Sequence, residues 1–293
     1  MLFSNIFIKK RLLAWSVVTV VISPAVHAQN VWSESTAKAK NKSRKAVNKV
    51  KQLKDHIKQW GTEADFNKGL LLGGRLNSNG WSGGIYYLVK DNPGSHHVWQ
   101  LHFSEIKHEK QIKQENIGVL PAKYGETTSY VFGKINNLYT VQVGYSKEQL
   151  VLPGVVEGNL SVSFRYGGGF SLALLKPYYL KVVKTDYTQP EPVSELIETK
   201  YSDSVAALFL ERTRILGSSK WSKGLGETKF VPGLYLEAAF VIEPAPNKGL
   251  IQAITLGVNG SVYTKSLPIM AELKAYNWSA SLFAGLALGK RWR

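Results

Sequence analysis

Hydrophobic and polar residues alternate along most of the chain after residue 68, with the period of two that is typical of a β-strand. The stretch 158–175 is the clearest example, because Leu160 and Phe164 belong to one face and Arg165 to the other. We interpret the three glycines at 167–169 as a turn between two such strands. Counted in this way, the alternation predicts ten strands, at 70–77, 81–89, 99–104, 127–134, 139–146, 160–166, 170–175, 234–240, 254–259 and 278–292.

The two faces of these strands predict two different environments. Aromatic residues lie on the apolar face close to strand ends, and they are Trp81, Tyr87, Trp99, Tyr139, Tyr145, Tyr166, Trp278 and Trp292. The opposite face is small and polar with isolated charges, namely Arg75, Arg165, Glu237 and Arg291. A membrane barrel has an aromatic girdle at each interface, whereas a soluble sandwich does not need one. We therefore expect an all-β, antiparallel transmembrane barrel of ten strands, within a range of eight to twelve, with these four charged residues in a polar network in its lumen.

Connection lengths agree with this interpretation. Four connections are short, at 90–96, 135–137, 167–169 and 243–248, and four are longer, at 108–123, 147–155, 184–228 and 265–275. Outer-membrane barrels have short periplasmic turns and longer outer loops, and only the tight turn at Asn79 and Gly80 departs from the pattern. An even strand count places both termini in the periplasm. In the longest outer loop, 184–228, Ser202 precedes an expected helix that ends before Gly217.

The first residues resemble a secretory signal peptide. Three basic residues at 9–11 precede an uncharged apolar run at 12–22, and a cleavage site follows Ala28. The run is shorter than the roughly 20 residues that a membrane-spanning helix needs. We therefore expect three parts, which are a signal peptide at 1–28, a periplasmic basic helical segment at 29–66 and an outer-membrane barrel at 67–293.

The segment 29–66 contains a strongly basic tract with helical periodicity. Apolar residues recur at spacings of three and four between Val47 and Trp60, which predicts a thin apolar stripe on a cationic helix. Its basic residues are Lys38, Lys40, Lys42, Arg44, Lys45, Lys49, Lys51, Lys54 and Lys58. We interpret the tract either as a solvated helix or as a docking element for anionic lipid, an anionic periplasmic partner or another envelope protein.

Composition narrows the possible functions. The formal net charge of +16 favours an anionic neighbour, and the export signal makes outer-membrane lipid a better candidate than nucleic acid. The chain has no cysteine, which excludes disulfides, thiolate metal sites and thiol catalysis.

Three segments resemble those of an uncharacterised outer-membrane β-barrel family of Bacteroidota. They are SEIKHEK at 104–110, FGKINNLYTVQVGY at 132–145 and FRYGGGFSLALLKPYYL at 164–180. The resemblance covers most of the chain after Gly69 and implies fold and location, without an activity that could be assigned to named residues. The terminal Arg-Trp-Arg departs from the terminal aromatic residue that is common in such barrels, because Trp292 lies one position inside the end.

His102 and Ser104 are the candidates for catalysis. They share one strand face, and the pair is similar to that of lipid A 3-O-deacylase barrels, so the alternative function is an outer-membrane lipid A acyl-ester hydrolase. The strand register argues against this hydrolase, because Trp99 and Phe103 lie on the lipid face and His102 therefore points inward. Glu105 lies on the opposite face, where it cannot orient the imidazole.

Other chemistry fits less well. The spacing of His96, His97, His102 and His108 is poor for a metal site, and we expect no metal and no cofactor. Acidic residues are too scattered for a protease of the omptin type, and a barrel of this size encloses only a narrow interior. We therefore expect a non-enzymatic outer-membrane barrel that acts as an envelope scaffold, binds a partner or passes small solutes.

Overall fold

The structure is a computed structural model that describes residues 67–116, 127–152, 160–186, 193–244 and 250–293, with single positions at 44, 45, 48, 124 and 188. The expected signal peptide at 1–28 lies outside the described residues. Of the basic segment at 29–66, only Arg44, Lys45 and Asn48 are described, and they are helical and exposed. The basic helix therefore stays a prediction.

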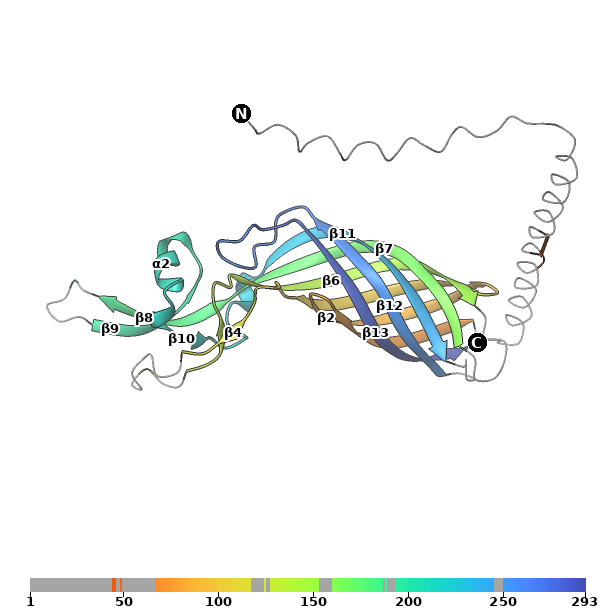
Figure 1. The fold of residues 1–293 in the computed structure, drawn as a ribbon, viewed down its shortest axis with the longest axis horizontal. Helices are drawn as coiled ribbons and strands as arrows, with labels where there is room; N and C mark the ends of the chain where they lie inside the picture. The colour runs from red at the N-terminus through yellow and green to blue at the C-terminus, as the bar shows by residue number, and fades with distance from the viewer. Residues whose placement is uncertain are drawn as a thin grey trace, which may run out of the picture. The chain divides into compact units, whose positions relative to one another are not determined.

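Eight antiparallel strands form a closed barrel (Figure 1). They are β1 (Lys68–Asn77), β2 (Gly80–Asn92), β3 (Ser95–Ile106), β6 (Asn136–Leu152), β7 (Leu160–Pro177), β11 (Lys229–Pro244), β12 (Leu250–Tyr263) and β13 (Trp278–Trp292). Their order around the barrel is β1-β13-β12-β11-β7-β6-β3-β2, and β1 pairs with both β2 and β13. Closure gives each strand a hydrogen-bonded neighbour on both sides, which is the condition for a sheet in lipid.

The predicted count of ten strands was wrong, and part of the reason is the glycine run in β7. The predicted strands at 160–166 and 170–175 are one continuous strand, and the glycines at 167–169 extend it without a turn. Gly168 lies opposite Tyr145 of β6, in register with the residues before and after it. Alternation is preserved across the glycines, because even-numbered side chains continue to point outward on both sides of them.

Close packing explains why glycine occupies these positions. A Cβ atom added at Gly167 would lie 2.2 Å from the carbonyl oxygen of Tyr145. At Gly144, on the neighbouring strand β6, an added Cβ would lie 2.2 Å from the hydroxyl of Tyr235, which extends across the interior from β11. Glycine inside a strand often marks such a close approach rather than the end of the strand.

The predicted strand at 127–134 also lies outside the barrel. Its central residues form β5 (Tyr130–Val131), which pairs with β4 (Lys113–Gln114) in a small two-stranded sheet. The segment therefore belongs to the connection between β3 and β6, which makes the barrel count eight.

The connection between β7 and β11 folds into a unit that we call the loop domain. A three-stranded sheet of β8 (Tyr179–Asp186), β9 (Val193–Lys200) and β10 (Ile215–Ser218) lies beyond one end of the barrel (Figure 1). The expected single helix is broken into η2 (Asp203–Val205), α2 (Ala206–Phe209) and η3 (Arg212–Arg214), and η4 (Leu225–Glu227) follows. Ser202 makes no side-chain capping hydrogen bond, and Gly217 lies in β10. Packing against the sheet decides this structure, because Phe209 and Ile215 are fully buried in the core of the domain.

The two ends of the barrel differ in the length of their connections. The short-turn end has the connections 93–94, 153–159 and 245–249, and the long-loop end has 78–79, 107–135, 178–228 and 264–277. Strand β6 runs from the long-loop end to the short-turn end, so the predicted short-end turn at 135–137 and the predicted outer loop at 147–155 were wrong. Both β1 and β13 have their terminal ends at the short-turn end, where Lys68 lies opposite Trp292.

Large apolar side chains cover the outside of the barrel. Phe170, Leu236 and Leu286 have exposed fractions of 76%, 74% and 66%. Aromatic rings join them, as where Trp99 packs 5.3 Å from Tyr145 near the short-turn end. The predicted apolar outer face is confirmed, and its extent exceeds the scattered apolar exposure of soluble proteins.

We predict that Gly144→Ala destabilises the barrel. The new methyl group must displace the Tyr235 ring, and such overpacking costs about 1–3 kcal/mol. The matched control is Gly74→Ala on β1, because a Cβ there would have no atom within 4 Å. The measurement is the midpoint of urea unfolding in detergent micelles. A Gly144→Ala midpoint equal to that of the control would contradict the packing argument.

Candidate functional site: the closed polar interior

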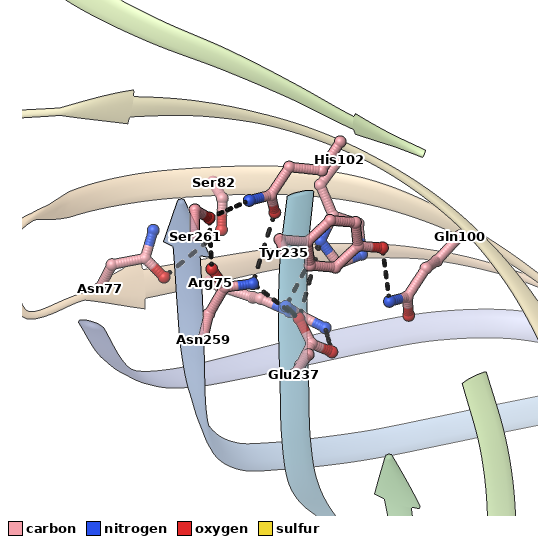
Figure 2. Close-up of polar contacts among 10 residues, drawn as sticks. Arg75, Asn77, Ser82, Gln100, His102, Tyr235, Glu237, Asn259 and Ser261 are labelled. Atoms are coloured by element: carbon pink, nitrogen blue, oxygen red, sulfur yellow. Dashed lines mark hydrogen bonds and ion pairs between the residues drawn. The ribbon is translucent and has the colours of Figure 1, made fainter. Parts of the chain in front are cut away.

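The centre of the interior is an ion pair between Arg75 of β1 and Glu237 of β11 (Figure 2). The guanidinium donates two hydrogen bonds to the carboxylate, with N to O distances of 2.6 and 2.9 Å. Both residues are buried, with exposed fractions of 6% and 4%. Strand alternation turns both inward, and the bidentate geometry offsets part of the cost of removing two charges from water.

Aromatic rings enclose the arginines of the interior. The guanidinium carbon of Arg75 lies 4.2 Å from the centre of the Phe283 ring and 5.4 Å from that of Tyr86. Arg165 of β7 lies 5.0 Å from the same Tyr86 ring. Tyr86 therefore contacts two cations, and its electron-rich face contributes to their stabilisation.

His102 belongs to this electrostatic cluster and does not pair with Ser104. Its Nδ1 lies 3.4 Å from a guanidinium nitrogen of Arg75 and 4.0 Å from the Glu237 carboxylate. The imidazole packs edge-on against Tyr86, with 5.1 Å between ring centres. Ser104 is buried on the same strand face, but no hydrogen bond joins it to His102 in the part of the chain that the structure describes. A nucleophile and base need such contact, so the pair lacks the geometry of a hydrolase.

The other two predicted lumen charges have acids of their own. Arg165 donates to Glu148 of β6 at 2.7 and 2.9 Å, and Arg291 of β13 donates to Glu243 of β11 at 2.7 Å. The structure thus brings Arg75 and Glu237 together, as predicted. Arg165 and Arg291 each pair with a different glutamate. The interior contains separate ion pairs instead of one shared network.

Glu148 and Glu243 were missed by the sequence reasoning because both were assigned to connections. The signal was available for Glu148, since Gln142, Ser146 and Glu148 continue the inward parity of the strand. Strand β6 extends to Leu152, six residues beyond the predicted strand at 139–146.

Polar side chains also fill the interior around the central ion pair. Gln142 donates to the Ser261 hydroxyl at 3.0 Å, and Gln100 donates to the Tyr235 hydroxyl at 2.9 Å (Figure 2). A cavity beside Arg75 and His102 has a volume of about 20 Å³, which is room for about one water molecule.

The short-turn side of the interior contains an apolar cluster beside the outer ion pairs. A cluster of buried side chains packs there across the barrel, namely Leu71, Tyr86, Leu88, Val98, Val241, Ile251, Ala253 and Ala287. Side chains of both kinds therefore fill the barrel, as is usual for eight strands.

The described ranges contain no group of three or more His, Asp and Glu residues that could hold a metal ion. His108 lies beyond the end of β3, away from His96 and His97, which lie near its start. Across the same ranges, no helix has the length and apolar character needed to cross a bilayer.

Comparison with known proteins shows distant similarity to solved barrels. No protein-family model and no curated protein matches the chain. Three crystal structures are similar at low identity. Neisserial surface protein A matches with a TM-score of 0.36 and 10% identity over 76% of this chain and 96% of its own. The N-terminal β-barrel domain of OprF from Pseudomonas aeruginosa matches with a TM-score of 0.30 and 7% identity over 77% and 97% of the two chains. Ail, the attachment invasion locus protein of Yersinia pestis, matches with a TM-score of 0.33 and 10% identity over 78% and 99%. The resemblance to a Bacteroidota family stays a prediction.

We predict that Glu237→Gln strongly destabilises the barrel. The substitution leaves the Arg75 charge buried without its carboxylate, which costs about 3–5 kcal/mol. Replacement of both partners, as in Arg75→Met with Glu237→Leu, should recover most of the loss. The measurement is again the urea midpoint in micelles.

The matched control for this prediction is Glu243→Gln. Its ion pair with Arg291 is less buried, with side-chain exposures of 18% for Arg291 and 11% for Glu243, so its loss should be smaller. Equal effects of the two substitutions would show that the central pair has no special role.

Proposed function

We propose that this chain is a non-enzymatic β-barrel of the bacterial outer membrane that holds a folded loop domain at the membrane surface for contact with a partner. The observation that carries the proposal is the combination of a closed sheet, an apolar outer face and a filled interior. The outward side chains, such as Phe170 and Leu236, require an apolar surrounding, and lipid supplies it all the way around a closed barrel.

The connection lengths support one orientation of the barrel. The short-turn end faces the periplasm and the long-loop end faces outward, as in other outer-membrane barrels. Both termini of the barrel are then periplasmic, which agrees with a signal peptide at 1–28 and a periplasmic basic segment at 29–66. The loop domain, which follows Pro177 at the end of β7, is then outside the cell.

Binding is favoured over the passage of solutes. A passage would have to cross the layer of Arg75, Glu237 and Tyr86, and the cavity beside it has a volume of only about 20 Å³. The loop domain has its own buried core around Phe209, which a structureless lid would not need. A folded outer unit on a closed barrel supports a scaffold or partner-binding role.

The localisation is directly testable. We expect the full-length protein, expressed in a Gram-negative host, to fractionate with the outer membrane. We also expect unheated and boiled samples to migrate differently on a denaturing gel, because closed barrels resist detergent unfolding until they are heated. A soluble periplasmic protein and a known outer-membrane protein serve as markers. Recovery of the chain with the soluble marker would refute the proposal.

The enzymatic alternative is a lipid A acyl-ester hydrolase that uses His102 and Ser104. The inward register and the contact of His102 with Arg75 disfavour it. We predict that lipid A has the same mass in cells without the protein, with the wild type and with His102→Ala or Ser104→Ala. The measurement is mass spectrometry of extracted lipid A. Loss of an acyl chain in the wild type alone would establish the hydrolase.

A further inference from the structure

A second cavity lies where the barrel meets the loop domain. It has a volume of about 530 Å³, within the range of small-molecule sites. The barrel contributes residues from the long-loop ends of β6 and β7, and the loops contribute residues from β5 and from the segment that follows β10. None of the interior ion pairs lines it.

The walls of this cavity are strongly cationic. Six lysines line it, and they are Lys107, Lys113, Lys134, Lys176, Lys220 and Lys223. Among the described residues, Glu105 is the single acid in the lining. Two of the lysines have acidic partners, since Lys107 lies 3.8 Å from Glu105 and Lys223 lies 3.1 Å from Glu198. The remaining four have no ion pair among the described residues, so the cavity holds an excess of positive charge.

Lys134 is the most constrained of these cations. Only 6% of it is exposed, and its ammonium group donates to the Gln111 side-chain oxygen at 3.1 Å. The Tyr178 ring lies 5.4 Å from the same nitrogen. A tight turn positions it, because Gly133 has a φ of 69° and the Lys134 amide donates to the Val131 carbonyl at 3.4 Å.

Lys176 is the second inner cation. It lies near the end of β7, opposite Asn137, and is 4% exposed. Its ammonium nitrogen lies 5.3 Å from the Trp221 ring. Aromatic faces stabilise an ammonium group only in part, and a buried charge without an acid is costly. A negatively charged ligand in the cavity would offset the cost of holding two such groups there.

Unpaired hydrogen-bond donors line the same cavity. The Gln111 side-chain amide nitrogen, the Tyr130 hydroxyl and the Ser219 hydroxyl are all buried without a partner among the described residues. Buried polar groups nearly always have a partner. An anion with several acceptor oxygens can satisfy such donors together with the two ammonium groups.

The chemistry favours a phosphate group over a carboxylate. Lysine acts as a point charge that suits the three-fold array of phosphate oxygens, whereas planar carboxylates are matched best by arginine. The rim is aromatic, because Trp221 donates to the Tyr139 hydroxyl at 2.8 Å while 63% of Trp221 stays exposed. Flat aromatic rims pack well against the C–H faces of sugar rings.

We propose that this cavity binds the phosphate group of a phosphorylated saccharide, with Lys134 and Lys176 as the inner cations and Trp221 against the sugar. The inference goes beyond the proposed function and does not depend on it. It can be tested on the folded protein in micelles, wherever the protein lies in the cell.

The pH dependence distinguishes this cavity from a cluster of surface lysines. Burial is the main cause that lowers the pKa of the Lys134 ammonium group to about 8. Glu105 of β3 opposes the shift, and nearby lysines add to it, namely Lys107, Lys113 and Lys176. A bound phosphate favours the protonated form, so affinity should fall as the pH rises through about 8. Exposed lysines would keep their charge to about pH 10.

The experiment measures binding of glucose 1-phosphate to the full-length protein in detergent micelles by titration calorimetry. We expect binding of glucose 1-phosphate, none of glucose, and affinity that is highest between about pH 6, below which the phosphate takes up its second proton, and about pH 8. Lys134→Met with Lys176→Met should weaken binding about tenfold or more. The matched control is Lys184→Met with Lys229→Met, which removes the same charge from exposed positions that do not line the cavity. It should change affinity less than about twofold.

Two further arms make the result decisive. Detergent-solubilised lipid A with and without its phosphates tests whether the ligand is carried on a lipid, and binding of only the phosphorylated lipid A would assign that source. Binding of glucose 1-phosphate alone would assign a soluble source. Absence of binding to both, or equal losses in the two double variants, would overturn the proposal. The wild-type pH profile provides a test that does not depend on the folding of any variant.

Discussion

The narrow interior of an eight-stranded closed sheet is the constraint on which the rest of the structure depends. A barrel of this size leaves space for side chains but not for a column of water. Every inward charge must therefore find a partner within the protein, because solvent cannot screen it. Two ion pairs meet this requirement, namely Arg75 with Glu237 and Arg165 with Glu148. The outward residues of the barrel are mostly apolar, because a charge on a surface that faces an apolar surrounding would be costly.

Because the inward polar groups are paired and the outward residues are apolar, the barrel strands offer few groups that could react with or bind a ligand. His102 is held by Arg75 and Tyr86 and serves the packing of the interior. At the long-loop end, by contrast, the connections are long enough to fold. The cationic cavity beside Lys134 combines rigid barrel residues with residues of the loops, so its shape depends on both.

The alternation of residues predicted the faces of the strands better than their number. Arg75 and Glu237 were placed in the lumen because parity within one strand is a local property. The strand count failed at 167–169, since a glycine run that permits close strand packing has the same sequence as a turn. Pairing of Arg165 with Glu148 depends on the register between β6 and β7, which no single-strand pattern contains. The lysine cavity was missed because its residues come from distant segments with no shared periodicity.

The pairing of β1 with β13 has a consequence for the order of folding. The seam joins the first and last strands of the barrel, so it cannot form until β13, with Trp292, meets β1 across the whole chain between them. Until then β1 has an open edge, and closing so long a chain carries an entropic cost that neighbouring hairpins do not have. The loop domain contrasts with it, because the strands β8, β9 and β10 pair within one contiguous stretch. The outer unit can thus acquire its structure while the barrel that carries it is still open.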